Sequence, residues 1–540
     1  MDALNNTLSS KIKNWISSID WVVFGALLLM INVSTVVKLV GIVFLLFFSL
    51  RNGFKVQDLI KSETPKFYLI VLFISLLHYL LSWNYFDMTV IVKTGVSLLY
   101  WGASFLILTM LYKRVKTSSL EKIKNAITLL LVLNIAFSFI DLLAIIIEIK
   151  DINPFTYKGS GTKYFMSTGD YIRGVSFDTS SVNAFICLFS FIYFLFDRKY
   201  LLAFLSVVIL LFTNSNLANL ILLPILILLF IQGSKFIKTI TVLCFGVILI
   251  FYIKIIPQSF AYIMNHFDSE YSVKQYYIKE NDSIQTAQNI HIKDSIITDY
   301  HHRFLAGNDL VKETPKEIVK NNSIKVPEKQ KEKLVKEEQV VETTPKEKDI
   351  DFLKEFIVAH YDVENFQDDS ILVSEKHPGK VLSHQQTLLF SMTSVEHFLI
   401  GNGPGNFSSK LAFKLSGVLN HPASTSNRFK IDDSFKKNHL RIYSYYFNED
   451  VAKHSILNAP YSSYNLLLGE YGYLGLFAFI FFYLGFFIKR MKLLQYGRYL
   501  LIALIPMLFI DYLFEGMSIL ILFELLMFVD IKSNTLIRKK

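Results

Sequence analysis

Charged residues and cysteines are scarce in this sequence. Only 19% of its 540 residues are charged and 52% are hydrophobic, whereas soluble proteins average about a quarter charged residues. This composition excludes an ordinary soluble protein, because so much apolar surface must face lipid. The two cysteines, Cys187 and Cys244, lie inside apolar segments, so they indicate nothing about disulfides or the redox compartment.

Metal-binding and nucleic-acid-binding patterns are also missing. No histidine pair has the spacing of metal ligands, and the adjacent His301 and His302 are a weak signal, so we expect no metal and no other cofactor. The net charge of +10 does not indicate nucleic acid, because Lys and Arg gather in short loops between apolar segments. The first residues, MDALNNTLSSKIKNW, lack the features of a cleaved signal peptide, and we expect the first apolar segment to remain as a span.

Apolar segments that approach the roughly 20 residues needed to cross a bilayer follow one another along much of the chain. They predict an all-α fold, a polytopic membrane helical bundle of about 12 spans with one large periplasmic loop. The expected spans lie near residues 21–33, 36–50, 67–83, 94–112, 126–147, 181–196, 201–212, 217–231, 236–256, 464–488, 500–512 and 517–531.

Lys and Arg recur in alternate loops and predict the orientation of the spans, because basic loops stay in the cytoplasm. The basic loops lie around residues 11–13, 51–66, 113–124, 198–199, 235–238, 489–498 and 538–540. The short turns at 32–35, 83–88, 214–216 and 511–515 carry no Lys or Arg. We expect these turns to face outward together with two longer segments, residues 149–180 and 257–460.

The large outer loop divides by composition. Residues 312–349 are nearly all charged, polar, Val or Pro, with no aromatic residue, so they should form a disordered linker. Stretches such as HQQTLLFSMTSVEHFLIGNGPGNF have near-helical apolar spacing, which predicts helices lying against the membrane or the bundle. We therefore expect a bundle of about nine spans over 1–256, the loop over 257–460, and about three spans over 461–540.

Three acidic residues, Asp141, Glu470 and Glu524, lie within or at the edge of apolar spans. Ionisable groups are costly there and tend to face a partner or a water-filled cavity, although a helix cap or an interfacial position explains them equally well. Eleven of the twelve histidines lie in the large outer loop and only His78 lies in a span. That distribution follows simply from polar residues avoiding lipid.

Two outer segments suggest anion binding. Arg173 stands just before the span expected from residue 181, where its guanidinium either faces lipid headgroups or binds a phosphate or diphosphate. In FLIGNGPGNF, the glycines Gly401, Gly403 and Gly405 permit a tight turn. Such a turn either brings backbone N–H groups to an anion or reverses the chain after a helix.

Three segments, in this order, resemble the family of O-antigen ligases and O-antigen polymerases with the related protein O-oligosaccharyltransferases. RGVSFDTSSVNAF resembles the family's Arg-Gly segment that opens a span, and VEHFLIGNGPGNF resembles its helix ending in a glycine turn. SSYNLLLGEYGYLGLFAF resembles its return to the membrane, a Tyr and a leucine run followed by Glu-x-Gly-x-x-Gly, here Tyr464, Glu470, Gly472 and Gly475. The resemblance covers residues 165–490.

The resemblance implies a metal-independent membrane glycosyltransferase that transfers or polymerises an undecaprenyl-diphosphate-linked glycan during assembly of surface polysaccharide, either lipopolysaccharide or capsule. The acceptor would be lipid A-core or another lipid-linked glycan. It also implies the bacterial inner membrane, with membrane lipid around the protein. The Lys and Arg distribution described above predicts both termini in the cytoplasm, the large loop in the periplasm, and no nucleic-acid partner.

Within this resemblance we expect Arg173, His454 and Glu470 to be catalytic. The family often has His-Asn ahead of the Glu, where this chain has Tyr461 and Ser462, and His454 lies nearby as a substitute. Arg173 would stabilise the departing diphosphate, and a histidine or Glu470 would accept the proton of the acceptor hydroxyl. The expected substrate-binding residues are Lys163, Gly401, Gly403, Gly405, Arg428, Arg441, Tyr461 and Tyr464.

Ligase and polymerase both stay open, since the position where ligases carry an arginine ahead of the glycine turn offers Lys380, Ser383 and His384 here. A transporter or flippase for lipid-linked glycan is the alternative, because many spans and intramembrane acids also suit alternating access. Against it, the sequence shows no two similar halves. An outward-facing sensor or anchor is a third interpretation, which lacks a cytoplasmic output domain.

Overall fold

The computed structural model describes residues 15–32, 34–60, 63–82, 86–153, 155, 171–255, 378–418, 429–447 and 456–539. These described residues are all-helical and include no strand. Met1–Ile256 and His377–Lys540 belong to one compact unit, so the outer loop from residue 378 onward packs with the helices on both sides of it. The expected linker, residues 312–349, lies outside the described residues.

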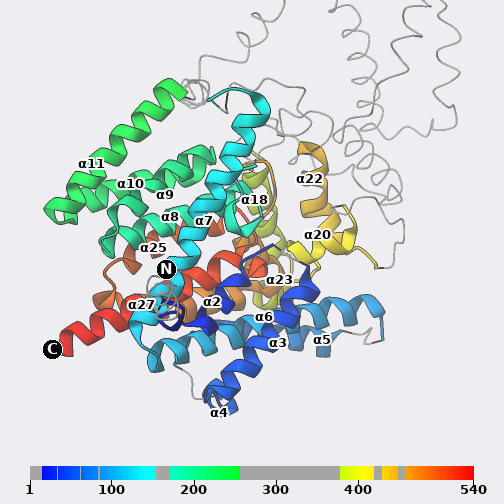
Figure 1. Cartoon of the computed structure of the whole chain (residues 1–540). Helices are drawn as coiled ribbons and strands as arrows, with labels where there is room; N and C mark the ends of the chain where they lie inside the picture. Colours follow the sequence, from blue (N-terminus) through cyan, green and yellow to red (C-terminus); the bar gives the residue numbers. More distant parts are fainter. Residues whose placement is uncertain are drawn as a thin grey trace, which may run out of the picture. The chain divides into compact units, whose positions relative to one another are not determined.

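Each of the twelve apolar segments expected as a span overlaps a helix, although the bounds differ. These helices are α2 (Trp21–Leu28), α3 (Thr35–Arg51), α5 (Phe67–Leu81), α6 (Met88–Thr117), α7 (Leu120–Ile149), α8 (Ser180–Phe196), α9 (Tyr200–Phe212), α10 (Asn216–Gln232), α11 (Lys235–Ile250), α23 (Ser463–Ala478), α25 (Gly497–Leu508) and α27 (Ser518–Lys539). A π-helical stretch, Phe479–Leu484, continues α23 into α24 (Gly485–Ile488). Figure 1 shows these helices in sequence colours.

Shorter helices connect these segments and build the described part of the outer loop. They are α4 (Val56–Ile60), α18 (Gly379–Ser391), α19 (Val395–Ile400), α20 (Lys410–Ser416), α21 (Asp433–Phe435), α22 (Arg441–Tyr446), α26 (Leu513–Gly516), and single turns at Gly174–Ser176, Phe251–Ile255, Lys436–Leu440 and Met491–Leu493.

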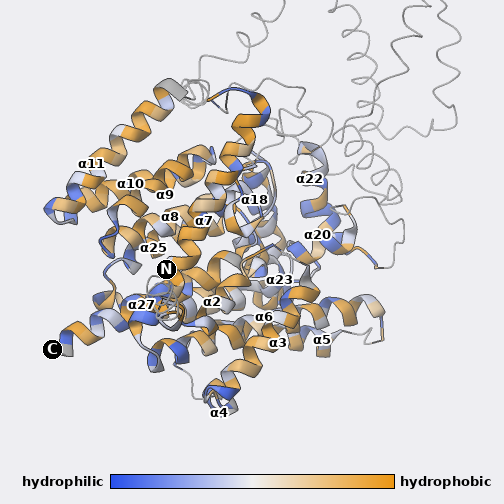
Figure 2. Cartoon of the chain, in the orientation of Figure 1, coloured by the Kyte–Doolittle hydropathy of each residue, from blue (hydrophilic) through white to orange (hydrophobic). Residues whose placement is uncertain are grey.

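Four helical stretches are long and apolar enough to cross a membrane: Met88–Thr117, Leu120–Ile149, Lys235–Ile253 and Ser463–Ile488. Hydrophobic residues cover most of α7, α10 and α11 (Figure 2). Several other apolar helices are shorter than the roughly 20 residues of a typical span, for example the 13 residues of α9. The membrane character of the chain therefore rests on four helices, and twelve crossings remain a prediction.

Local sequence explains where several of these helices begin. Asp20, Ser34, Asp87 and Thr179 each stand immediately before a helix, and each side chain accepts a hydrogen bond from a backbone N–H two or three residues later. Such side chains satisfy donors that have no partner within the helix. Polar residues thus divide a nearly continuous apolar sequence into separate helices.

The basic loops meet at one end of the bundle. Arg114 Nε donates to Asp20 Oδ2 at 2.8 Å, and Lys124 pairs with Asp197 at 3.1 Å. The last helix reaches the same end, because Lys532 Nζ donates to the carbonyl of Val115, in the last turn of α6, and to that of Ser118, which follows α6. Loops that the charge pattern assigns to one side of the membrane therefore contact one another.

The loops expected to face outward meet at the opposite end, called here the outer end. The N–H of Asn32, between α2 and α3, donates to the carbonyl of Ser176, before α8, at 2.7 Å. Lys38 Nζ, near the start of α3, donates to the carbonyl of Gly516, the last residue of α26, at 3.2 Å. Which end faces the cytoplasm stays a prediction of the charge pattern.

An aromatic cluster joins three of the spans. The Trp101 ring packs edge-on against Phe67 and Tyr471, with ring centroids 5.8 Å apart in both pairs. Trp101 Nε1 also donates to the Tyr471 hydroxyl at 2.8 Å. These contacts fix α5, α6 and α23 to one another. They also position Glu470, because it directly precedes Tyr471 in α23.

Candidate functional site

The turn that follows α19 closes around the Glu470 side chain. This segment, residues 401–408, is called the glycine turn. Glu470 Oε2 accepts a hydrogen bond from the N–H of Gly405 at 2.8 Å. Oε1 accepts from the N–H groups of Phe407 at 3.3 Å and Ser408 at 3.1 Å. Because Glu470 is 1% exposed, its carboxylate occupies the turn in the way that an external anion would.

The backbones of the two segments are also hydrogen-bonded. The N–H of Asn402 donates to the carbonyl of Gly469 at 2.8 Å, and the N–H of Gly403 donates to the carbonyl of Glu470 at 3.1 Å. Helix α23 is kinked at Gly472, where φ is 63° and ψ is −167°. A non-helical residue interrupts the hydrogen-bond ladder of a helix, which leaves nearby carbonyls available to the glycine turn.

Two glycines are required for this contact. A Cβ atom on Gly401, where φ is +78°, would lie 2.5 Å from the carbonyl carbon of Glu470. A Cβ atom on Gly472 would lie 2.5 Å from the carbonyl carbon of Leu399. Both positions also have a left-handed backbone that favours glycine. Glycine is therefore needed on each side of the contact.

Two polar residues of the spans hold the glycine turn from its other side. His78 Nε2, on α5, lies 2.7 Å from the carbonyl oxygen of Ile400. Lys93 Nζ, on α6, donates to Asn406 Oδ1 at 2.6 Å, and Lys93 is buried. The turn is thus fixed to α5, α6 and α23 together.

These contacts bring together residues that the sequence suggested for separate roles. Gly405 was expected to contact substrate and Glu470 to act in catalysis, yet they bind one another. The N–H groups of the turn that were offered to an external anion already donate to Glu470 or to backbone carbonyls. Because Glu470 accepts three hydrogen bonds, the geometry favours a positioning role for it over proton transfer.

Arg173 lies in a turn held by polar side chains of α7. Asp141 Oδ2 accepts from the N–H of Arg173 at 2.9 Å and from that of Gly174 at 3.0 Å. Asn134 Oδ1 accepts from the N–H of Val175 at 3.0 Å. The intramembrane Asp141 therefore orders the backbone beside Arg173.

Asn183 of α8, which belongs to the same sequence motif as Arg173, also holds this turn in place. Asn183 Nδ2 donates to the carbonyl of Ile172 at 2.9 Å and to Ser138 Oγ at 3.0 Å. The Arg173 side chain, by contrast, is exposed, and its guanidinium carbon lies 5.0 Å from the centre of the Tyr171 ring. The turn thus presents one cation at the outer end while its backbone is fixed in the bundle.

Three lysines gather next to this turn and form the outer lysine cluster: Lys38, Lys410 and Lys414. The three lie within electrostatic range of one another, and Lys38 and Lys414 also lie within range of Asp178, which follows Arg173 in the same motif. Burial lowers the pKa of Lys414, the charge of Lys410 lowers it further, and Glu515 and Asp178 act in the opposite direction. The cluster brings α3, α20 and the Arg173 motif to one place.

Glu515 fixes the start of α20 within this cluster. Its carboxylate accepts from the N–H of Lys410 at 2.5 Å and from that of Leu411 at 3.4 Å. Burial, and after it the negative charge of Glu470, raise the pKa of Glu515. The position of Glu515 thus links the glycine turn to the lysine cluster.

A second polar group lies on the buried face of α18. Lys380 is 1% exposed, and its Nζ donates to the carbonyl of Tyr461 and, at 2.7 Å, to that of Ile510. Burial lowers the pKa of Lys380 to about 7, and the charge of Asp511 opposes that shift. This lysine therefore connects α18 to the residue pair before α23 and to the loop between α25 and α26.

His384 lies near Lys380 and His439 lies near His384, and each has a buried Nδ1 atom with no hydrogen-bond partner among the described residues. Burial lowers the pKa of His384 to about 4, and the charge of Lys380 adds to the shift. Burial likewise lowers the pKa of His439 to about 3, with His384 contributing. Both rings are therefore neutral at pH 7.

The remaining expected site residues divide into packed and undescribed ones. The Tyr461 ring packs between Phe413 and Tyr512, at centroid distances of 5.0 and 5.4 Å, and burial raises its pKa well above the ordinary value. Tyr464 OH donates to the carbonyl of Ile505 at 2.9 Å. Arg441 is half-buried at the start of α22. Lys163, Arg428 and His454 lie outside the described residues.

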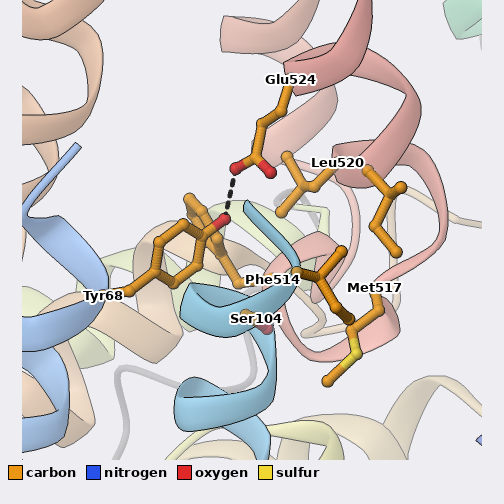
Figure 3. A pocket seen from close by; sticks show the side chains of 8 residues that line it. Tyr68, Ser104, Phe514, Met517, Leu520 and Glu524 are labelled. Atoms are coloured by element: carbon orange, nitrogen blue, oxygen red, sulfur yellow. Dashed lines mark hydrogen bonds between the residues drawn. The ribbon is translucent and has the colours of Figure 1, made fainter. Parts of the chain in front are cut away.

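Glu524 forms a separate polar site inside the bundle. Its Oε1 accepts from Tyr68 OH at 2.6 Å and from Tyr483 OH at 3.0 Å. A small cavity lies beside it, lined by Ser104 and Phe514 among others (Figure 3). Ser104 Oγ is buried and has no partner among the described residues. This acid therefore has hydroxyl partners, as expected for an ionisable group within a span.

Sequence reasoning missed several polar residues of the outer end. Lys38 and Lys93 lie just inside the outer ends of α3 and α6, where the charge pattern predicts no cations. Their position could have marked them as candidate site residues, because basic residues are normally enriched on the cytoplasmic side. Lys410, Lys414 and His439 carried no such signal, since they lie in a polar loop.

Comparisons with protein families, curated proteins and solved structures find no match to this chain. Within the part of the chain that the structure describes, no group of three or more His, Cys, Asp and Glu residues is arranged to hold a metal ion.

Replacing Glu470 tests its role in the glycine turn. Glu470→Gln should lower the free energy of unfolding by about 1–3 kcal/mol, because one acceptor oxygen becomes an NH2 group that faces N–H donors. Glu524→Gln is the matched control, since a single glutamine oxygen can still accept both tyrosine hydroxyls, and it should cost less than about 1 kcal/mol. Denaturant unfolding in detergent measures both, and equal losses would contradict the role of Glu470.

The buried histidines predict acid sensitivity. Unfolding restores their ordinary pKa of 6.5, so their contribution to stability is fully present above about pH 6.5 and is lost as the pH falls toward 4, by up to about 1.4 kcal/mol per pH unit for each histidine. His439→Leu should make this dependence shallower. Unfolding free energies measured between pH 7 and pH 4 check the prediction, and an unchanged slope in the variant would contradict it.

Proposed function

We propose that the chain is a membrane glycosyltransferase of the O-antigen ligase or polymerase type. In this proposal about 12 spans cross the bacterial inner membrane, both termini are cytoplasmic, and the large loop is periplasmic. The enzyme transfers or polymerises an undecaprenyl-diphosphate-linked glycan, and its acceptor is lipid A-core or another lipid-linked glycan. The product contributes to surface polysaccharide.

The observation that carries the proposal is the meeting of distant motif residues at the outer end. The glycine turn binds Glu470 directly, and Ser408, the last residue of the turn, is followed closely by Lys410. Asp178 of the Arg173 motif lies within electrostatic range of Lys38 and Lys414. The three segments that resemble the family are therefore parts of one polar region, which supports a shared function.

The outer lysine cluster suits the chemistry of the donor. Cleavage of a sugar–diphosphate bond leaves negative charge on the departing diphosphate, and nearby cations lower the barrier by stabilising that charge. Lys410 and Lys414 extend from α20, and exposed Arg173 lies in the adjoining motif. We assign these side chains to the diphosphate.

The acceptor hydroxyl must lose a proton in the same step. We assign this proton to a neutral imidazole, and His384 is the candidate because its side chain is half-buried, whereas His439 is fully buried. Glu470 then holds the glycine turn in place and takes no part in proton transfer. The sugar carbon gains the acceptor oxygen as it loses the diphosphate oxygen, so no metal or redox group is needed for balance.

Deletion of the gene, followed by complementation, tests the proposal in the cell. Loss of the polymerase should leave lipopolysaccharide with a single repeat, and loss of the ligase should leave bare core. Lys410→Gln with Lys414→Gln should reduce glycan transfer at least about tenfold, because each charged contact contributes about 1.5–3 kcal/mol. Lys437→Gln, an exposed lysine of the same loop outside the cluster, is the matched control and should restore wild-type ladders.

Two outcomes would count against the proposal. Unchanged lipopolysaccharide and capsule ladders after deletion would remove its basis. Movement of lipid-linked glycan across liposomes by the purified protein, without a new glycosidic bond, would favour the transporter interpretation.

A further inference from the structure

Helix α18 has an inverted distribution of polar and apolar residues. Its buried residues include Lys380, Ser383, Thr387 and Ser391, each 1% exposed or less. Apart from Gln385, its large exposed side chains are apolar: Val381, Leu388 and Leu389, followed by Met392 just after the helix, which is 68% exposed. In water an outer-loop helix buries its leucines and exposes its lysines. The surroundings of this face are therefore apolar.

Helical geometry separates the two sets of residues cleanly. Spacings of three and four residues place side chains on one face of a helix, and both the buried polar set and the exposed apolar set follow those spacings. Gln385 is the one polar residue on the exposed face of α18. Leu382 and Phe390 are buried beside the polar residues, so the buried face is mixed and the unusual feature of α18 is its apolar exposed face.

The buried polar face is satisfied by hydrogen bonds to α23. Asn465 Nδ2 donates to Ser383 Oγ at 3.0 Å, and Thr387 Oγ1 donates to Asn465 Oδ1 at 3.1 Å. Lys380 is bound to two carbonyls, as described above. Because these groups are paired, the exposed leucines are not left outside by a failure to pack.

The apolar surface continues through α19 onto a membrane-spanning helix. Val395 of α19 is 75% exposed, and Phe398 is also exposed. The Phe398 ring stacks on Tyr473 of α23, with centroids 4.2 Å apart. Beyond Tyr473, the exposed Phe477 and Phe481 belong to the stretch that is long and apolar enough to cross a membrane.

We propose that α18 and α19 form an interfacial hairpin whose apolar face is buried in the outer leaflet of the lipid bilayer. Lipid is the occupant because the face is continuous with the lipid-facing side of α23. The polar Thr393 and Glu396, between and at the start of these helices, are exposed, which places that end at headgroup level. Such helices typically lie about 5–10 Å into the headgroup–acyl boundary.

The hairpin fixes the height of the outer end above the membrane surface. It begins with Lys380 and leads directly into the glycine turn, so lipid contact and the Glu470 contact lie at the two ends of one short segment. The inference does not depend on the proposed glycosyl transfer, because it follows only from exposure and packing.

Fluorescence quenching tests the proposal in the full chain. With the buried Cys187 and Cys244 replaced by alanine, single cysteines at Leu388 and at Val395 are labelled with bimane in lipid nanodiscs. Nitroxide-labelled phosphatidylcholine should remove about half or more of the emission at both sites, because the face lies in the shallow acyl region. Lys437→Cys, at an exposed site of the same loop, is the matched control and should respond to aqueous iodide instead.

Two results would overturn the proposal. Quenching by iodide at Leu388 and Val395 to the extent seen at Lys437 would mean that the face is in water. Protection of both sites from lipid nitroxide and iodide alike would mean that protein covers it, either a second copy or another part of this chain. A circular dichroism spectrum matching wild type confirms that each labelled variant is folded.

Discussion

The buried contact between the Glu470 carboxylate and the backbone of the glycine turn determines how the outer end is built. A carboxylate is costly to remove from water unless donors surround it, and three N–H groups of the turn fulfil that need. The Glu470 carboxylate in turn supplies the acceptors that the N–H donors of the glycine turn need. Each segment is therefore poorly satisfied without the other, which makes their association specific as well as favourable.

Other features of the outer end follow from this contact. The kink at Gly472 leaves carbonyls for the turn, and Gly401 allows the two backbones to approach. With the turn fixed, α20 starts beside Glu515 and the outer lysine cluster takes shape. On the other side of the turn, α18 and α19 hold their polar face against α23 and leave an apolar face outward.

The sequence predicted the helices better than the site. Long apolar segments and capping residues such as Asp87 identify helices directly, because these signals are local. It also singled out Glu470, Gly401 and Arg173. It could not predict that Glu470 binds the glycine turn, since that pairing joins residues far apart in the chain and depends on the kink at Gly472. Burial of Lys380 and His439 was hidden for the same reason, because polar residues in a loop are normally exposed.

Amide hydrogen exchange of the glycine turn tests the central contact most directly. In the native protein, the N–H groups of Gly405, Phe407 and Ser408 should exchange as slowly as the buried turns of α23, because Glu470 accepts their hydrogen bonds. In Glu470→Ala the protection should be lost at these three residues while α23 stays protected. Exchange of the three amides in the native protein at the rate of an unstructured peptide would contradict the account.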